Sequence, residues 1–524
     1  GRRLLTETRD ARNEYEGHLS KVTQEAGFAF SGKVFGLLFG FVAQVVIAKL
    51  LGADVLGVFV LAWTVIQAVS ILTVFGFEGS LVRYIAMYVP QGKKGEARST
   101  FLLASRIGFA AAILGAVAVA LLRGPIANGI FHEPRLEPAL LWISVAVVPL
   151  TLMKILGGAL RGVKDVKRFV LGYDIAYRVP RLVAFLLLYF TGLRFLAGSE
   201  LLGIVGASVV GSLVSFLVLA HFVRRRAPFL MGAESAPASV IPAAAIVAYS
   251  AAMLADVAMA FTTEQTDRLL LGYFLVSADV GVYNVAALVA SLTIFLILSF
   301  NAIFSSVIAD VYHRGQMEIL RSLFRSITRW IIVLTLPIYA WILAAGEATL
   351  SIFGTEFVAG YAPLAILATG QMVAACTGPV GVCLAMTGYQ RYNVWNALGM
   401  AIVSVGLNIF LIPRMGIAGA ALGTGIAFVL VNVARLIEVR ALLKMLPYDR
   451  STLKVVATAV VALAGVYFAR GFAPASAGFL WSAIVLVAGT GLVGAFTMAL
   501  GLSSEDRYVL RSAVERFRRS RGGS

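Results

Sequence analysis

The sequence AKLLGADVLGVF (residues 48–59) has a second, altered copy in FLVSADVGVY (residues 274–283). Each copy stands where one long apolar run ends and the next begins, and each places an Ala-Asp-Val triplet at that junction. The two triplets, which begin at Ala53 and Ala278, are separated by 225 residues. A motif that returns in the same setting at this distance indicates an internal duplication.

Two further matches support this duplication. Leu160-Arg161-Gly162 resembles Met386-Thr387-Gly388, and GIVGA (residues 203–207) resembles GIAGA (residues 416–420). All three pairs occur in the same order, and six apolar runs separate the members of each pair. Because six is an even number, the two copies have the same orientation across a membrane. Parallel repeats of this kind are typical of transporters.

The composition is that of a membrane protein. Of the 524 residues, 60% are hydrophobic and 14% are charged, and the mean hydropathy is +0.89. Soluble domains have about 45–50% apolar and about 25% charged residues. A membrane helix needs about 20 mostly apolar residues. Fourteen such runs are present, near residues 27–50, 55–75, 100–122, 139–160, 169–190, 202–223, 241–263, 281–308, 328–346, 361–386, 393–412, 416–438, 453–472 and 479–500.

Lysine and arginine are distributed unevenly over the loops between these runs. The side that holds both chain ends carries groups such as Lys93-Lys94, Arg224 to Arg226 and six arginines from Arg507 to Arg521. No loop on the other side has more than two. By the positive-inside rule both termini are cytoplasmic, and the net charge of +17 suits anionic lipid rather than nucleic acid.

The fourteen apolar runs and the internal repeat predict an all-α polytopic membrane protein with fourteen transmembrane helices, arranged as two six-helix lobes and a C-terminal pair. Cys376 and Cys383 lie in one apolar run, so we expect packing roles rather than a disulfide. The expected segments are a basic, amphipathic cytoplasmic N-terminus (1–26), a first lobe (27–226), a cytoplasmic linker (227–240), a second lobe (241–445), the last helix pair (446–502) and a basic cytoplasmic tail (503–524).

The chain resembles the polysaccharide flippases, which include the Wzx-type O-antigen flippases and, more distantly, the lipid II flippases. Three features carry the resemblance: the six-plus-six-plus-two spans, GFAFSGKVFGLLFGFVAQVVIAKLLGADVLGVF (residues 27–59) and TDRLLLGYFLVSADVGVYNVA (residues 266–286). It covers about residues 20–500 and implies the same superfamily (MOP) as the multidrug MATE exporters. It also implies a V-shaped bundle of two lobes, located in the cell membrane, which turns over a polyprenyl-linked sugar from the cytoplasmic to the outer leaflet.

The fifth run, FVLGYDIAYRVPRLVAFLLLY (residues 169–189), carries three charges on one helix face, because Asp174, Arg178 and Arg181 are four and three residues apart. Arg178 lies about 15 Å into the helix, near the middle of the bilayer. A charge there costs at least about 2.5 kcal/mol, so it normally faces a protein interior or an aqueous cavity. Asp174 could neutralise Arg178 in a buried pair, or the two arginines could form a cationic substrate site, and both can hold.

The seventh run ends in FTTEQTDRLLLGYF (residues 261–274). Glu264 precedes Arg268 by four residues, which is the favourable order for a helical ion pair, so we expect a local pair at the outer surface. Asp256 and Asp267 share another face and are expected to line a cavity. A buried carboxylate can take up or release a proton, so Asp256, or else Asp267, is predicted to couple transport to an ion. Satisfied packing polarity is the alternative.

Three further cations, Arg83, Lys154 and Arg161, stand near the cytoplasmic ends of the second and fourth runs. They predict either the inner mouth of a substrate cavity or side chains that snorkel to lipid headgroups. The second half instead offers neutral polar residues within its spans, namely Gln371, Asn393, Asn396 and Asn408. This contrast suits a substrate with an anionic phosphate end and a neutral sugar end.

Several chemistries find no support in the sequence. It has four histidines, all near the ends of runs, and neither a His/Cys metal cluster nor a nucleotide-binding phosphate loop. The outer loops are too short for the catalytic residues of a membrane glycosyltransferase or sugar-lipid polymerase. We therefore predict no enzyme, no cofactor and no nucleic-acid partner, with a proton, a sodium ion or the membrane potential as the driving force.

The resemblance and these residues together predict a flippase for a polyprenyl-(pyro)phosphate-linked oligosaccharide that works by alternating access. Arg178 and Arg181 would receive the phosphates, since guanidinium groups match phosphate oxygens. Its partners would be the sugar lipid, the bilayer and other polysaccharide-assembly proteins. The alternative is a MATE-like, cation-coupled multidrug exporter, which would have twelve spans and acidic cavities for cationic drugs. A scaffold of a glycan-assembly complex is a third interpretation.

Overall fold

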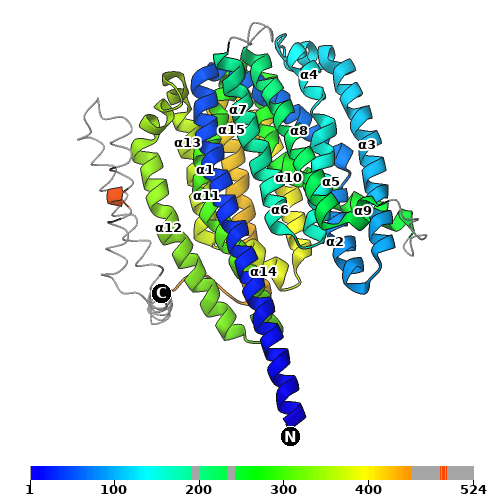
Figure 1. The fold of residues 1–524 in the computed structure, drawn as a ribbon. Coiled ribbons are helices and arrows are strands. Elements are labelled where there is room, and N and C mark those ends of the chain that lie inside the picture. Colours follow the sequence, from blue (N-terminus) through cyan, green and yellow to red (C-terminus); the bar gives the residue numbers. More distant parts are fainter. Residues whose placement is uncertain are drawn as a thin grey trace. The chain divides into compact units, whose positions relative to one another are not determined.

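The computed structural model describes residues 2–191, 200–232 and 242–449 and a few isolated positions after them. In these ranges the chain is helical and contains no strand (Figure 1). Eight of the described helices are long and apolar enough to cross a membrane, or nine if the bent pair α4 (Leu136–Ser144) and α5 (Val147–Gly162) forms one span. The expectation of an all-helical, multi-pass membrane protein is confirmed.

Helices cover the first twelve predicted spans. The first six fall on α1 (Arg2–Val74), α3 (Lys94–Gly124), the α4–α5 pair, α6 (Val166–Val170) with α7 (Ala176–Phe190), and α8 (Glu200–Arg226), while α2 (Phe77–Tyr88) and α9 (Pro228–Met231) connect them. The next six fall on α10 (Ala243–Phe274), α11 (Ser277–His313), α12 (Met317–Ser351), α13 (Tyr361–Thr377) with α14 (Val380–Met386), and α15 (Gln390–Leu443).

The structure describes the two ends of the chain to different extents. Because α1 begins at Arg2, the backbone of the predicted N-terminal segment (1–26) is helical and continues directly into the first span. The last two predicted spans and the basic tail (503–524) lie outside the described residues, apart from a few isolated positions in 484–491.

Two of the long helices are broken at a glycine. Gly52 in α1 has φ 74° and Gly416 in α15 has φ 59°, which is the left-handed region that favours glycine. A straight helix of the 54 residues of α15 would measure about 81 Å, whereas the hydrocarbon core is about 30 Å thick. The break at Gly416 therefore divides a helix that is too long for a single crossing.

The described chain divides into two compact units. Unit 1 consists of Gly1–Leu51 and Val58–Phe261, and unit 2 consists of Gly52–Gly57 and Thr262–Ser524. The short segment at the Gly52 break thus belongs to unit 2, although the chain on both sides of it belongs to unit 1. The long helix α10 is divided after Phe261.

Within unit 2, the two copies of the Ala-Asp-Val motif contact each other through their backbones. A Cβ on Gly57 would overlap the carbonyl oxygen of Ser277, and a Cβ on Gly281 would overlap that of Ala53. The contact is reciprocal, because each of these Cβ positions also lies 3.1 Å from the other glycine's nitrogen. The Ala53 N–H, which follows the break at Gly52, donates to Oε1 of Glu356 at 2.6 Å.

Apolar packing surrounds Cys383, and a hydrogen bond holds the charged fifth span in place. Cys383 is fully buried in a cluster with Ile308 and Phe324, and both cysteines are free, as expected. In unit 1 the chain between α6 and α7 forms a π-helical turn, Leu171–Ile175. There the Gly172 carbonyl accepts a hydrogen bond of 2.7 Å from the Ser215 hydroxyl of α8, which holds the turn that contains Asp174 against α8.

The reciprocal glycine contact generates a stability prediction. Gly281→Ala places a methyl group onto the Ala53 carbonyl, and such overpacking costs about 1–3 kcal/mol. We expect a lower apparent melting temperature of the purified protein in detergent. Gly406→Ala is the matched control, because a Cβ there meets open space within a helix. Equal melting temperatures for the two variants would show that the contact does not constrain the fold.

Candidate functional site

Asp174 and Arg178 form the ion pair that their spacing allows. Nη2 of Arg178 lies 3.7 Å from Oδ1 of Asp174, and their side chains are 43% and 24% exposed. Gly36 and Gly40 of α1 make room for the guanidinium, since a Cβ on Gly40 would lie 2.5 Å from Nη1 of Arg178. The pair is long and the arginine is well exposed, so this cation still has donors available for an anion.

Arg181, one helical turn further along α7, is held in a different way. Its guanidinium carbon lies 5.1 Å from the ring centroid of Phe59, 5.7 Å from that of Trp63 and 5.9 Å from that of Tyr177. Within the described residues it forms no ion pair, and its Nε has no hydrogen-bond partner. Aromatic faces attract a cation without neutralising it, so Arg181 keeps its full charge.

A cavity of about 280 Å³ in unit 1 brings three of the predicted residues together: Lys154, Arg161 and Asp256. Glu78, in the first turn of α2, lines the same cavity and accepts a 2.5 Å hydrogen bond from Nη2 of Arg161. The Arg161 guanidinium also lies 4.9 Å from the Phe169 ring centroid. The cavity therefore contains two cations and two carboxylates.

The first part of α10 carries Asp256 to this cavity. The hydroxyls of Ser250 and Ser80 are 2.6 Å apart, and a Cβ on Gly76 would overlap the Ser250 carbonyl, so α10 approaches α2 closely here. Arg83 does not line the cavity; its guanidinium lies 4.5 Å from the ring centroid of Tyr249. Of the three cations expected at the cavity mouth, the structure thus brings together Lys154 and Arg161 and leaves Arg83 beside α10.

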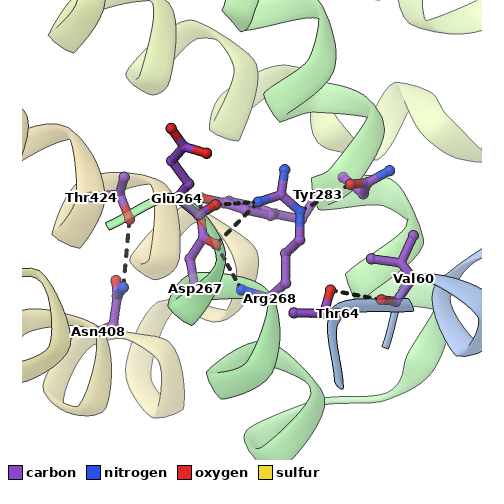
Figure 2. Close-up of polar contacts among 9 residues, drawn as sticks. Val60, Thr64, Glu264, Asp267, Arg268, Tyr283, Asn408 and Thr424 are labelled. Atoms are coloured by element: carbon purple, nitrogen blue, oxygen red, sulfur yellow. Dashed lines mark hydrogen bonds and ion pairs between the residues drawn. The ribbon is translucent and has the colours of Figure 1, made fainter. Parts of the chain in front are cut away.

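Asp267 belongs to a second cavity, of about 380 Å³, within unit 2. Its side chain is 6% exposed. Its carboxylate accepts hydrogen bonds from the Tyr283 hydroxyl at 2.6 Å and from the Arg268 backbone N–H at 2.8 Å (Figure 2). Asp256 and Asp267 are therefore placed in different units and in unlike surroundings, although they share one face of α10.

The expected ion pair between Glu264 and Arg268 is wrong. Nη1 of Arg268 donates instead to the Glu264 backbone carbonyl at 2.6 Å, and its ion pair, at 3.4 Å, is with Asp267. The physical reason is the neighbouring helix, because Oδ1 of Asn284 on α11 accepts from Nε of Arg268 at 3.0 Å and turns the guanidinium toward α11.

Two aromatic contacts were missed from the sequence, and the repeated motif contained the signal for both. Phe59 ends the first copy and lies over Arg181, and Tyr283 ends the second copy and donates to Asp267. The two residues hold the same position after the motif glycine, in Gly57-Val58-Phe59 and Gly281-Val282-Tyr283. In each unit the aromatic residue that ends the motif, two positions after its glycine, therefore contacts a charged side chain.

The long apolar helices define the class as a multi-pass membrane protein. The model of the polysaccharide biosynthesis protein family matches residues 22–309. The chain belongs to this family. No curated protein sequence matches the chain.

Solved structures share the fold. The lipid II flippase MurJ in an inward closed conformation has a TM-score of 0.69 at 14% identity, covering 90% of this chain and 98% of that one. An inward-facing multidrug resistance MATE transporter of the MOP superfamily has a TM-score of 0.64 at 15% identity, covering 80% and 98%. A MOP superfamily transporter from Pyrococcus furiosus, described as having a binding pocket of reverse polarity, has a TM-score of 0.53 at 14% identity, covering 80% and 93%.

The hydrogen bond to Asp267 generates a second prediction. Tyr283→Phe removes one donor from a buried carboxylate, and a hydrogen bond to a charged group contributes about 1.5–3 kcal/mol. We expect a clearly lower melting temperature of the purified protein. Tyr392→Phe is the control, because Tyr392 is 40% exposed. A melting temperature that is unaffected by Tyr283→Phe would show that Asp267 does not depend on this bond.

Proposed function

We propose that the protein is a flippase that moves a polyprenyl-(pyro)phosphate-linked oligosaccharide from the cytoplasmic to the outer leaflet of the cell membrane. One observation carries the proposal: Arg178 and Arg181 stand one turn apart on a membrane-spanning helix, and neither is fully neutralised. The family of the chain, the polysaccharide biosynthesis proteins, supports it.

The physical need for such a site follows from the substrate. A pyrophosphate headgroup carries about two negative charges, and a single charge at the centre of a bilayer already costs several kcal/mol. Two guanidinium groups can replace the lost water with charge-assisted hydrogen bonds in a geometry that fits phosphate oxygens. The prenyl chain needs no such site, since it stays in the lipid during the transfer.

The helix lengths favour fourteen spans in this proposal. α1 and α15 would each cross the membrane twice, with the turn between the crossings at the glycine break. The α6–α7 region, which carries three charges, would add another. Together with the α4–α5 pair and the other long helices, this makes twelve. Residues 446–502 would supply the last two, and both termini would be cytoplasmic.

The transport cycle would begin with the headgroup entering from the cytoplasm past Arg83, Lys154 and Arg161. Arg161 is paired with Glu78 in the structure, so an arriving phosphate would compete with this carboxylate for the guanidinium. The phosphates would then pass to Arg178 and Arg181, and a rearrangement of the two repeats would expose them on the outer side. Asp256, or Asp267, would exchange a proton or a sodium ion to reset the cycle.

The arginines provide the direct test of this function. In proteoliposomes with a labelled lipid-linked sugar, Arg178→Ala and Arg181→Ala should each reduce flipping by at least about tenfold, because charge-assisted hydrogen bonds to the phosphate are lost. Lysine at either position should restore part of the activity, since it keeps the charge and loses the planar fork.

Arg414→Ala is the matched control, because the Arg414 guanidinium lies 3.7 Å from the Phe410 ring centroid on an exposed part of α15. It should leave flipping unchanged. Full flipping by the double alanine variant at positions 178 and 181 contradicts the cationic site. Drug resistance conferred on an efflux-deficient host, without any flipping of sugar lipids, would instead favour the multidrug exporter.

Asp256 generates a separate prediction on ion coupling. Asparagine cannot bind and release a proton, so Asp256→Asn should slow transport and flatten its response to an imposed pH gradient. Asp310→Asn is the control, because Asp310 is an exposed residue paired with Arg314 at 3.0 Å. If the Asp256→Asn variant responds to the gradient as the wild type does, this carboxylate is not the coupling group.

A further inference from the structure

The unit 2 cavity differs in chemistry from the arginines of unit 1. It has a volume of about 380 Å³ and is lined by polar residues that include Glu264, Asp267, Arg268 and Gln371, together with apolar residues such as Leu298 and Phe428. One water molecule takes about 30 Å³ of liquid, so the volume corresponds to roughly a dozen waters. A dehydrated cation needs far less space than this.

The charges that line this cavity do not add up to a positive site. Arg268 is occupied by Asp267, by the Glu264 carbonyl and by Asn284, and its charge is balanced by the Asp267 carboxylate. The remaining carboxylate in the lining is that of Glu264, which is an exposed residue. If Glu264 is ionised the cavity is negative, and if it is protonated the cavity is neutral. In neither state does it attract an anion.

Two of the groups that line the cavity offer acceptors for hydroxyl groups, and the amides of Gln265 and Gln371 add donors. Oε1 of Gln371 is buried and has no hydrogen-bond partner among the described residues. The Ser291 hydroxyl already donates to the Leu288 carbonyl at 2.6 Å, so its lone pairs are what it offers a ligand. Unsatisfied buried acceptors cost free energy, which a ligand rich in O–H donors would recover. Apolar walls with a few fixed polar groups are typical of small-molecule sites.

We propose that this cavity binds a neutral sugar ring of the transported headgroup and discriminates against an acidic sugar. The inference rests on the proposed flippase function and adds the substrate class of a second site. A neutral sugar presents hydroxyls to Gln371, Ser291 and Glu264 and brings no charge. A uronic-type carboxylate would meet the Glu264 and Asp267 carboxylates with no free cation to balance it.

The test compares three probes in the full-length protein: a polyprenyl pyrophosphate without sugar, the same lipid with an N-acetylhexosamine, and the same lipid with a hexuronic acid. The wild type should bind the neutral sugar lipid at least about tenfold more tightly than the acidic one. Gln371→Leu should weaken binding of the neutral sugar lipid by about fivefold and leave the sugar-free lipid unaffected. Glu264→Gln should narrow the discrimination against the acidic sugar.

Thr369→Val is the matched control, because Thr369 stands two residues earlier on α13 and lines a separate apolar groove. It should change none of the three affinities. Equal wild-type affinities for the two sugar lipids overturn the inference and leave the flippase proposal intact. A Gln371→Leu variant that changes only the sodium or pH dependence of transport also overturns it, since the cavity is then an ion site. If the wild type neither binds nor flips any of the lipids, the flippase proposal itself fails.

Discussion

Gly57 and Gly281 allow two copies of one motif to meet backbone to backbone, and the aromatic residue that follows each glycine contacts a charged side chain. A side chain on either glycine would meet a carbonyl oxygen of the other copy. Two residues after each glycine stands an aromatic ring, Phe59 in one copy and Tyr283 in the other. The first ring supports the charge of Arg181 and the second fixes the carboxylate of Asp267. In each copy an aromatic residue two positions after the glycine thus contacts a charged side chain.

The two units differ in how far their arginine charges are compensated by neighbouring groups. In unit 1, Arg181 is held by ring faces and Arg178 by a long ion pair, so both cations stay reactive toward anions. In unit 2, Arg268 donates to Asn284 and to the Glu264 carbonyl, and its charge is balanced by Asp267. Burial penalises an unbalanced charge more than a balanced one, so holding Arg181 among aromatic rings costs more free energy than holding Arg268 beside Asp267.

Features that depend on the local sequence pattern were predicted correctly, whereas contacts that involve residues from another helix were not. Apolar runs predicted the segments that form the long helices, because hydropathy along the chain dictates which segments enter lipid. Helical spacing correctly paired Asp174 with Arg178. The same reasoning paired Glu264 with Arg268, and it failed because Asn284 on the next helix turns the guanidinium away. It also grouped Asp256 with Asp267, which share a face of α10 but belong to different units. The rings around Arg181 come from Phe59 and Trp63, more than a hundred residues earlier in the chain, which no local period reveals.

The segment Gly52–Gly57 belongs to unit 2 while the chain before and after it belongs to unit 1. The polypeptide therefore passes from one unit to the other three times, after Leu51, after Gly57 and after Phe261. A gene cut in the linker between α9 and α10 would not release two self-sufficient halves. The C-terminal fragment would lack the segment Gly52–Gly57, which packs on the Ser277 carbonyl and supplies the Ala53 N–H that donates to Glu356. Such fragments should accumulate only when both are made in the same cell, because the second unit is not encoded by one continuous part of the gene.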